Sequence, residues 1–413
     1  MMRADNLQLL LTLAWRNLWR NPRRTAIVLL AVALGVWAMV VVGSFMRGWH
    51  DQVVENAVDT LTGYVQIRHE DYWDDPAIDN SLPAPSEELL EVLEGDQVSA
   101  WSARLRVPAM VSSERASART TLVGMDPDAE RGLSFIPEAV TEGRYLESAD
   151  DASLVMGERL AERLDTRPGR RVVLMSQNPE NRLVDRGFRV AGLYQARLEA
   201  TEEAFVFTGL ETAERLLESE NRISEISLAP ATGLTPEALR DALREVIDVG
   251  EVRTWQEAQP LTVARLQLIE GIMYIWFVVV VIAMAFGITN SLIMAVTERA
   301  REFSLVQALG LGRRKVLGMV VSESLMVLAV GAVIGNLLAF LTVAAFPDGL
   351  DLTAIAGGGG GDLTGMGGVV DLVLAAEDLA AATGLVLILG ILASLYPAWW
   401  AMRRAPASSL NHQ

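Results

Sequence analysis

Four long stretches of the chain are apolar and almost free of charge. They cover residues 25–46, 271–297, 316–347 and 379–402. Each is longer than the ~20 residues that a helix needs to cross a ~30 Å hydrocarbon core. A buried core helix of this length usually carries a polar stripe, which these stretches lack. The pattern therefore predicts four transmembrane helices. The first is predicted to be retained, because its apolar run is about twice that of a signal peptide.

The segment between the first two stretches, residues 47–270, alternates strand-like and helix-like patterns. The predicted strands are 64–67, 104–110, 119–123, 171–175, 188–193, 204–207 and 223–228. The predicted helices are 87–93, 158–164, 211–218 and 236–247, the last with Thr235 as its N-cap. The predicted fold class is an α-helical membrane protein with four transmembrane helices (one plus three). A large α+β domain is inserted between helices 1 and 2.

Helical spacing continues past the membrane at both ends of this inserted segment. Apolar residues recur every four positions after the first stretch, and again before the second, where a helix is predicted to begin after Pro260. One interpretation is a helical stalk that continues the first two spans outward. The alternative is two ordinary helix ends at the membrane interface.

Charge is distributed unevenly along the chain, and this predicts its orientation. The segments 1–24, 298–315 and 403–413 carry twelve basic and three acidic residues, whereas the remainder carries 23 basic and 49 acidic ones. Basic segments next to spans stay in the cytoplasm. Both termini and residues 298–315 are therefore predicted to be cytoplasmic. The acidic segment 47–270 and the Gly-rich loop 348–378 are predicted to face the other side.

Composition excludes several kinds of chemistry. The chain has no cysteine and three separated histidines, so it offers no thiolate nucleophile, disulfide framework or recognisable zinc site. Its sole lysine, Lys315, follows two arginines, so the P-loop sequence is missing and ATP hydrolysis is not expected in this chain. The acidic balance disfavours nucleic-acid binding. We expect no catalytic residue, metal site or bound cofactor in the chain.

Two cytoplasmic segments are predicted to form amphipathic helices. In residues 298–315 an apolar face recurs every three residues through Phe303, Val306 and Leu309, and arginines flank both ends. Such a helix can lie on a membrane surface or dock into the groove of a partner, and composition leaves both open. The N-terminal segment 1–24 has tryptophans and arginines suited to an interfacial helix.

Three polar residues inside the predicted spans are candidates for a function in the membrane. Glu323 is the only ionisable group well within a span, and Asn290 and Asn336 are amides. Intramembrane acids are functional candidates by default. A proton relay normally needs a chain of such groups, which favours a structural role for Glu323. Hydrogen bonding between helices is favoured for the two asparagines.

Four motifs resemble those of one known family. They are AWRNLWRNPRRTAIVLLAVALG (14–35), MGERLAERLDTRPGRRVV (156–173), ERAREFSLVQALGLGRRK (298–315) and ASLYPAWWAMRRAPASSL (393–410). Together they resemble ABC-transporter permeases of the MacB/FtsX type, in particular the lipoprotein-releasing branch. Arg170 stands where an acidic residue is commoner in the family. The resemblance spans the whole chain, in the right order.

The resemblance implies a permease of the bacterial inner membrane that pairs with a second copy or a close paralogue. It implies two copies of a separate ATPase, which hold ATP and magnesium and receive the coupling helix of each permease. Residues of that helix here are Glu298, Arg299, Arg301, Glu302, Phe303, Val306, Leu309, Arg313 and Arg314. A lipid or lipoprotein is the implied substrate, and a periplasmic carrier or adaptor is a further partner.

Three other functions stay open at this point. One is a mechanotransmitting permease that exports peptides or drugs with a periplasmic adaptor. Another is a scaffold that activates a periplasmic hydrolase, although the inserted segment is long for that branch. A membrane-embedded enzyme is the fourth hypothesis overall, and the sequence offers no nucleophile–base pair for it.

Overall fold

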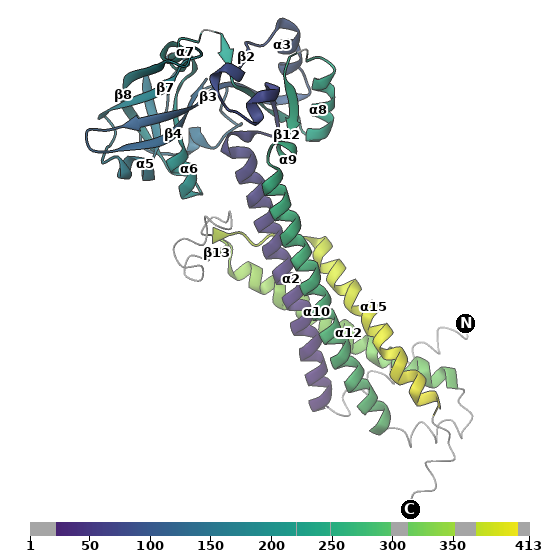
Figure 1. The fold of residues 1–413 in the computed structure, drawn as a ribbon. Helices are drawn as coiled ribbons and strands as arrows, with labels where there is room; N and C mark the ends of the chain where they lie inside the picture. Colours follow the sequence, from purple (N-terminus) through teal and green to yellow (C-terminus); the bar gives the residue numbers. More distant parts are fainter. Residues whose placement is uncertain (1–21, 220, 248, 299–312, 352–368, 404–413) are drawn as a thin grey trace, which may run out of the picture. The chain divides into compact units, whose positions relative to one another are not determined.

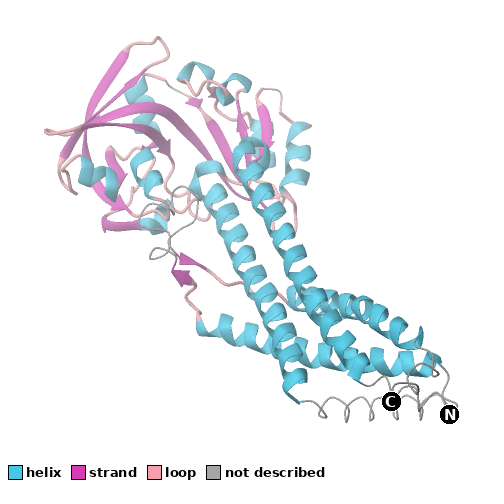
Figure 2. Ribbon diagram, turned by 60° about the horizontal axis from the view of Figure 1, so that its bottom comes forward, coloured by secondary structure: helices cyan, strands magenta, loops and turns pink. Residues whose placement is uncertain are grey.

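The computed structural model describes residues 22–219, 221–247, 249–298, 313–351 and 369–403. The chain divides into two compact units. The helical unit contains residues 1–49, 267–350 and 370–413, and the β-rich unit contains residues 50–266 and 351–369. Figure 2 shows helices and strands in different colours, and nearly all the strands belong to the β-rich unit.

Four long apolar helices correspond to the four predicted apolar stretches. They are α2 (Pro22–Ala57), α10 (Pro260–Glu298), α12 (Arg313–Ala345) and α15 (Ala376–Arg403) (Figure 1). Each contains a stretch long and apolar enough to cross a membrane. α10 begins at Pro260, where proline loses nothing because the first N–H of a helix has no intrahelical acceptor. α2 and α10 extend well beyond their apolar stretches, as the stalk interpretation requires.

The core of the helical unit combines side chains from all four helices. Val36 of α2, Ile288 of α10, Leu328 of α12 and Val386 of α15 belong to one buried cluster. Gly331 and Gly335 form a GxxxG spacing on α12, the arrangement that lets membrane helices approach closely. A Cβ on Gly331 would stand 2.7 Å from Val32 Cγ1, and one on Gly335 would stand 2.6 Å from the Ala33 carbonyl oxygen. These glycines therefore bring α12 against α2.

The β-rich unit contains one ten-stranded mixed sheet, ordered β12-β1-β11-β3-β4-β9-β6-β8-β5, in which β7 pairs with both β3 and β8. The strands are β1 (Val65–Arg68), β3 (Val98–Ser112), β4 (Ser117–Met125), β5 (Val140–Gly143), β6 (Ser153–Gly157), β7 (Arg171–Gln177), β8 (Leu183–Tyr194), β9 (Phe205–Gly209), β11 (Glu225–Pro230) and β12 (Glu251–Thr254). Because β7 joins β8 back to β3, the ring β3-β4-β9-β6-β8-β7 is a closed barrel. Strands β12, β1 and β11 form an open sheet that continues from β3.

Strand β3 is shared by the barrel and the open sheet. Its first residues, up to and including Arg104, pair with β11. The residues from Arg104 onward pair with β4. Its last residues, from Ala109, also pair with β7. The fifteen residues of β3 therefore connect the two halves of the unit through a single strand.

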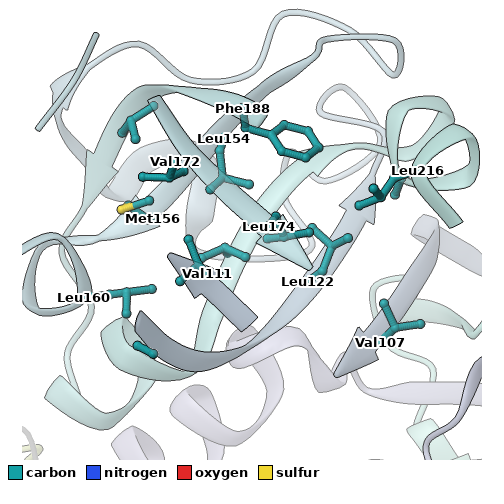
Figure 3. Close-up of a cluster of buried hydrophobic side chains, with 14 of the residues drawn as sticks. Val107, Val111, Leu122, Leu154, Met156, Leu160, Val172, Leu174, Phe188 and Leu216 are labelled. Carbon is teal, nitrogen blue, oxygen red and sulfur yellow. The ribbon is translucent and has the colours of Figure 1, made fainter. Parts of the chain in front are cut away.

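Alternate residues of the barrel strands belong to two separate cores. Leu122, Leu154 and Val206 point into the interior, together with residues of the helices α5 (Glu158–Arg163) and α7 (Leu210–Leu217). Figure 3 shows this interior, with Phe188 and Leu174 among its side chains. The next residue along each of these three strands, such as Val123 or Phe207, belongs to a second cluster outside the barrel wall.

The open sheet is covered by two helices, α3 (Glu87–Leu93) and α8 (Pro236–Arg244), whose apolar faces form a third core. Thr235 caps α8 by accepting a hydrogen bond from the Ala238 N–H, as predicted. Four short helices complete the unit: α4 (Ile136–Ala139), α6 (Glu199–Ala204), α9 (Trp255–Ala258) and the π-helix η1 (Val58–Thr62). Smaller pieces are η2 (Glu70–Trp73), η3 (Ile78–Asn80) and the pairs β2 (Leu82–Pro83) with β10 (Arg222–Ile223) and β13 (Leu350–Asp351) with β14 (Val369–Val370).

The α+β prediction is confirmed, with differences in detail. The predicted strand 223–228 is divided at Ser224 between β10 and β11, and the predicted helix 236–247 ends at Arg244. Strands β5, β6 and β12 were not predicted. The loop 348–378 contains β13 and β14 at its ends, and its Gly-rich part lies outside the described residues.

Candidate functional site

The predicted coupling residues lie mostly outside the part of the chain that the structure describes. Glu298 is the last residue of α10, and Arg313 and Arg314 open α12. The first residue of the predicted coupling segment therefore belongs to α10, and its last three belong to α12. Its central residues, Arg299, Arg301, Glu302, Phe303, Val306 and Leu309, stay a prediction.

The predicted intramembrane polar residues have different surroundings. The side-chain amide of Asn336 on α12 donates a hydrogen bond to Thr383 Oγ1 on α15 at 2.7 Å, a contact between two helices. Asn290 is exposed on α10, and Glu323 is half-buried on α12. Trp37 on α2 also donates to Thr342 on α12 at 2.9 Å. These hydrogen bonds hold the helices together, a usual role of polar groups in membrane bundles.

An ion pair joins α2 to α15 in the same unit. Arg47 donates two hydrogen bonds to the carboxylate of Asp378, at 3.0 and 2.8 Å. The fork of a guanidinium matches the two oxygens of a carboxylate, so this pair fixes orientation as well as distance. Arg47 follows the apolar stretch of α2, and Asp378 lies in the first turn of α15.

The C-terminal end of α2 has an unusual backbone. The helix widens into the π-helical turn η1, closed by a hydrogen bond from the Gly63 N–H to the Val58 carbonyl at 2.8 Å. Leu61 has φ 71° and ψ −7°, the left-handed conformation, which costs about 1–2 kcal/mol for a residue with a Cβ. Gly63 also has a positive φ, 65°. Contacts elsewhere must therefore hold this turn.

Those contacts converge on the carbonyl oxygen of Leu61. It accepts hydrogen bonds from Arg104 Nη1, from Gln66 Nε2 at 3.2 Å and from Ser227 Oγ at 3.3 Å. The Leu61 side chain is fully buried in the cluster outside the barrel wall, next to Val123 and other apolar residues. The strained residue at the end of α2 is thus held by both its carbonyl and its side chain.

Arg104 is a buried guanidinium whose donors contact several elements. It donates two hydrogen bonds, of 2.6 and 2.8 Å, to the carboxylate of Glu130, which lies in the loop after β4. It also donates to Glu225 at 3.3 Å and to Ser227 at 2.9 Å, both on β11. Arg104, Glu130 and Glu225 are fully buried. We call the group of Leu61, Arg104, Glu130, Glu225 and Ser227 the α2 junction.

Charge is balanced within the α2 junction by further arginines. Glu225 also pairs with Arg68 at 2.5 Å and lies 3.9 Å from Arg106. Burial alone would raise the pKa of Glu225, but the nearby arginines outweigh it and hold the pKa below its ordinary value. For Glu130 the same opposition between burial and the charge of Arg104 leaves the pKa lowered. Both carboxylates are therefore ionised at neutral pH.

Gln259, the residue directly before α10, is bonded to the end of α2 and to the turn that follows it. Gln259 Nε2 donates to the Ala57 carbonyl at 3.1 Å and to Thr62 Oγ1 at 2.5 Å. The turn before it is fixed by a capping box, in which Thr254 and Glu257 bind each other's backbone N–H groups. Both long helices that enter the β-rich unit are therefore bonded to each other at the point of entry.

A cavity of about 440 Å³ lies beside the last turns of α2. An ion pair of 2.6 Å between Glu55 on α2 and Arg197 contributes to its wall. Burial and the neighbouring Glu55 raise the pKa of Asp59, and Arg197 opposes this only in part. Its other lining residues are Asn56, Thr60, Gly132, Leu133, Ser134, Phe135, Glu138, Ala139, Gln195, Ala196, Leu198 and Thr201. Among the described residues, His, Cys, Asp and Glu form no group of three that could hold a metal ion.

We predict that stability falls at acid pH because of the α2 junction. The pKa values of Glu130 and Glu225 are lowered by folding. Their stabilising contribution is therefore complete above the ordinary glutamate pKa of about 4.3 and is lost as the pH falls below it, through the folded pKa values. The melting temperature of the full-length protein in detergent should drop over this range. In Glu130→Gln the drop should be smaller, and an equal drop would contradict the assignment.

The α2 junction was not predicted from the sequence. The predicted strand 104–110 begins at Arg104, but nothing in the local pattern indicates that this arginine is buried. The only signal was alternation along β3, where Leu105 and Val107 are apolar and Arg104 and Arg106 polar, a pattern typical of a strand with one solvated face. The end of α2 and the loop that carries Glu130 cover that second face.

Comparison with known proteins places both parts of the chain in one family. Residues 25–246 match the family model of the MacB-like periplasmic core domain. Residues 274–406 match that of the FtsX-like permease C-terminal region. The chain belongs to the MacB/FtsX family of ABC-transporter permeases.

Relatives of this permease differ in the activities that their names give. The lipoprotein-releasing system transmembrane protein LolC of Neisseria meningitidis serogroup B is 23% identical over 309 residues, 70% of this chain and 69% of LolC. The macrolide export ATP-binding/permease protein MacB of Nitrobacter winogradskyi is 25% identical over 94% of this chain, which spans 58% of that protein's length. An uncharacterized ABC transporter permease of Bacillus subtilis, YvrN, is 22% identical over 79% of this chain and 85% of its own.

Two solved structures resemble part of the permease. The periplasmic region of MacB from Actinobacillus actinomycetemcomitans has a TM-score of 0.36 at 13% identity, covering 50% of this chain and 94% of that one. The extracellular domain of the transporter YknZ from Gram-positive bacteria has a TM-score of 0.32 at 14% identity, covering 46% and 99%. The family models and the four apolar helices make this chain a membrane-embedded ABC permease with a periplasmic region.

Proposed function

We propose that this permease works with a separate ATPase to extract or export a lipoprotein, lipid or other amphiphile at the periplasmic side of the bacterial inner membrane. The observation that carries the proposal is the similarity to the lipoprotein-releasing protein LolC over 70% of the chain. The matches to family models of ABC-transporter permeases support a partner ATPase, which we propose is a separate subunit. An amphiphile suits a protein whose apolar helices border a large acidic domain in sequence.

The assembly that we propose contains two permease chains and two ATPase subunits. The second permease is another copy or a close paralogue, and a periplasmic carrier or adaptor receives the substrate. The coupling segment, residues 298–315, docks on the ATPase, supported by its basic ends and apolar face. Both termini are cytoplasmic, because the basic residues are concentrated in the two terminal segments and in 298–315.

In this proposal ATP binding brings the ATPases together, and α2 and α10 carry the movement to the periplasmic domain. Support comes from the length of these two helices, 36 and 39 residues, which exceeds what a membrane needs. At 1.5 Å per residue, the excess of each corresponds to roughly 20 Å of helix or more beyond the hydrocarbon core.

The direct test is ATP-dependent release of substrate from the reconstituted complex. The permease is purified together with the ABC ATPase that co-purifies with it, and the complex is examined by mass spectrometry for retained lipid or acylated protein. Proteoliposomes loaded with a fluorescent triacylated peptide should then release it only with hydrolysable ATP. Retention of no amphiphile, together with no release above the level seen with a hydrolysis-deficient ATPase, would contradict the proposal.

A second candidate, export of a peptide or drug with a periplasmic adaptor, is favoured by one observation. The macrolide exporter MacB aligns with 94% of this chain, more than LolC does. The same proteoliposomes distinguish the two functions. ATP-driven movement of a soluble macrolide or peptide, without release of the acylated peptide, would favour export.

A further inference from the structure

The α2 junction is placed where a movement of α2 would reach both halves of the periplasmic domain. Arg104 lies on β3 at the residue where pairing passes from β11 of the open sheet to β4 of the barrel. Its guanidinium contacts Leu61 at the end of α2, Glu130 after the barrel strand β4, and Glu225 and Ser227 on the open sheet. One side chain is thus bonded to the helix and to both halves.

The chemistry of these contacts suits the transmission of movement. They are charge-assisted and fully buried, so water does not compete for the donors and the bonds are stronger than exposed ones. The fork of Arg104 meets Glu130 with two parallel bonds, which fixes angle as well as distance. The backbone that follows η1 is less restricted than these side-chain contacts. It passes through Gly63, which has a positive φ and, as a glycine, can change its backbone angles easily.

The side chain of Leu61 completes the connection on the barrel side. It is buried against the outer wall of the barrel, whose strands contribute Val123, Tyr194 and Phe207 to the same cluster. A helix that pivoted at Gly63 would need to withdraw this side chain and to break the bond from Arg104. The bond from Arg104 and the buried side chain therefore hold the strained turn together with the bonds from Gln66 and Ser227.

We propose that Arg104 is the positioning residue that makes the barrel and the open sheet move together with the end of α2. This rests on the proposed function, in which α2 carries an ATP-driven movement. Without the guanidinium, α2 would move while the domain lagged behind, and ATP would be hydrolysed with little substrate released. Arg104 thus acts on release through Leu61 and does not touch the substrate.

The experiment uses the full-length permease with its ATPase, and the cysteine-free sequence allows labels to be placed at will. One labelled pair joins α2 to the barrel, Asp51→Cys with Val173→Cys, and another joins α2 to the sheet side, Asp51→Cys with Ala238→Cys. All three positions are exposed. Electron–electron distances are measured with and without ATP, alongside release of the acylated peptide per ATP hydrolysed.

The test variant is Arg104→Met with Glu130→Gln, which removes the link without leaving Glu130 as an unpaired buried charge. Glu225 keeps Arg68 and Arg106. In the native sequence both distances should be the same with and without ATP. In the double variant they should shift or broaden on ATP binding, and release per ATP should fall about two- to thirty-fold, the range seen for residues that couple distant sites. Arg104→Lys should give an intermediate result, because it keeps the charge but not the fork.

The matched control is Arg115→Met, an arginine whose ion pair with Asp165 is exposed. It should leave distances and release as in the native protein. A double variant that melts at a lower temperature but keeps native distances and native release per ATP would show a merely structural role and overturn the proposal. If the native complex releases no amphiphile with ATP, the proposed function fails instead, and the distances alone still decide the role of Arg104.

Discussion

Replacing Arg104 by alanine is expected to lower the free energy of unfolding of the periplasmic domain by about 3–5 kcal/mol, the usual cost of removing one partner from a buried ion pair. The substitution leaves the fully buried carboxylate of Glu130 without its bidentate partner and takes one of three arginines from Glu225. It also removes a donor from the carbonyl of the left-handed Leu61. Three groups lose stabilisation at once.

The measurement is thermal unfolding of the full-length protein in detergent, followed by tryptophan fluorescence. For a domain of this size, 3–5 kcal/mol corresponds to a fall of roughly 6–20 °C in Tm. Arg115→Ala is the control, because its exposed ion pair is worth only about 0–1 kcal/mol. A fall no larger than that of Arg115→Ala would show that the buried network contributes little.

The double variant Arg104→Met with Glu130→Gln should be much closer to the native protein in stability. Replacing a buried ion pair by uncharged groups of similar volume is often neutral, because the desolvation cost of both charges disappears. Arg104→Ala is therefore expected to lower stability strongly, whereas the double variant is expected to lower coupling with little loss of stability. Arg104→Ala reports on burial of charge, and the double variant reports on the mechanical link.

The second large effect is expected in the coupling segment. Phe303→Asp places a charge on the apolar face that Phe303 forms with Val306 and Leu309. If this face docks into a groove of the ATPase, the charge must be desolvated there, and binding should weaken by about 2 kcal/mol or more, roughly thirty-fold. Co-purification of the ATPase and ATP-driven release should both be lost, while membrane insertion is retained.

Ala308→Asp is the matched control for this substitution. At 100° per residue, position 308 lies on the side of a helix opposite to the apolar face. It should retain the ATPase and the release activity. Equal loss in both variants would mean that negative charge in this segment is harmful for another reason, such as its proximity to anionic lipid. Normal binding of the ATPase by Phe303→Asp would refute the docking hypothesis.

Much of the local structure could be predicted from the sequence, because it depends on neighbours in the chain. Helix α3 has the predicted bounds, and Thr235 caps α8 as expected. The strands that were missed are short and lack a clear alternation. β6 is a run of five residues, buried almost throughout and paired in parallel with β8, and β5 is an exposed edge strand. Partners distant in sequence stabilise both, and a local pattern carries no information about such partners.

The sequence by itself determined the membrane character and the division of charge. Four apolar stretches are long enough to span a bilayer, and the net charge of −17 combines basic terminal and 298–315 segments with an acidic remainder. These properties follow from transfer of side chains between water and hydrocarbon, which depends on composition within a window of residues. Only the tertiary structure decided that β7 closes the barrel and that Arg104 is buried. Both depend on segments more than forty residues apart meeting in space, since Arg104 binds Leu61 on one side and Glu225 on the other.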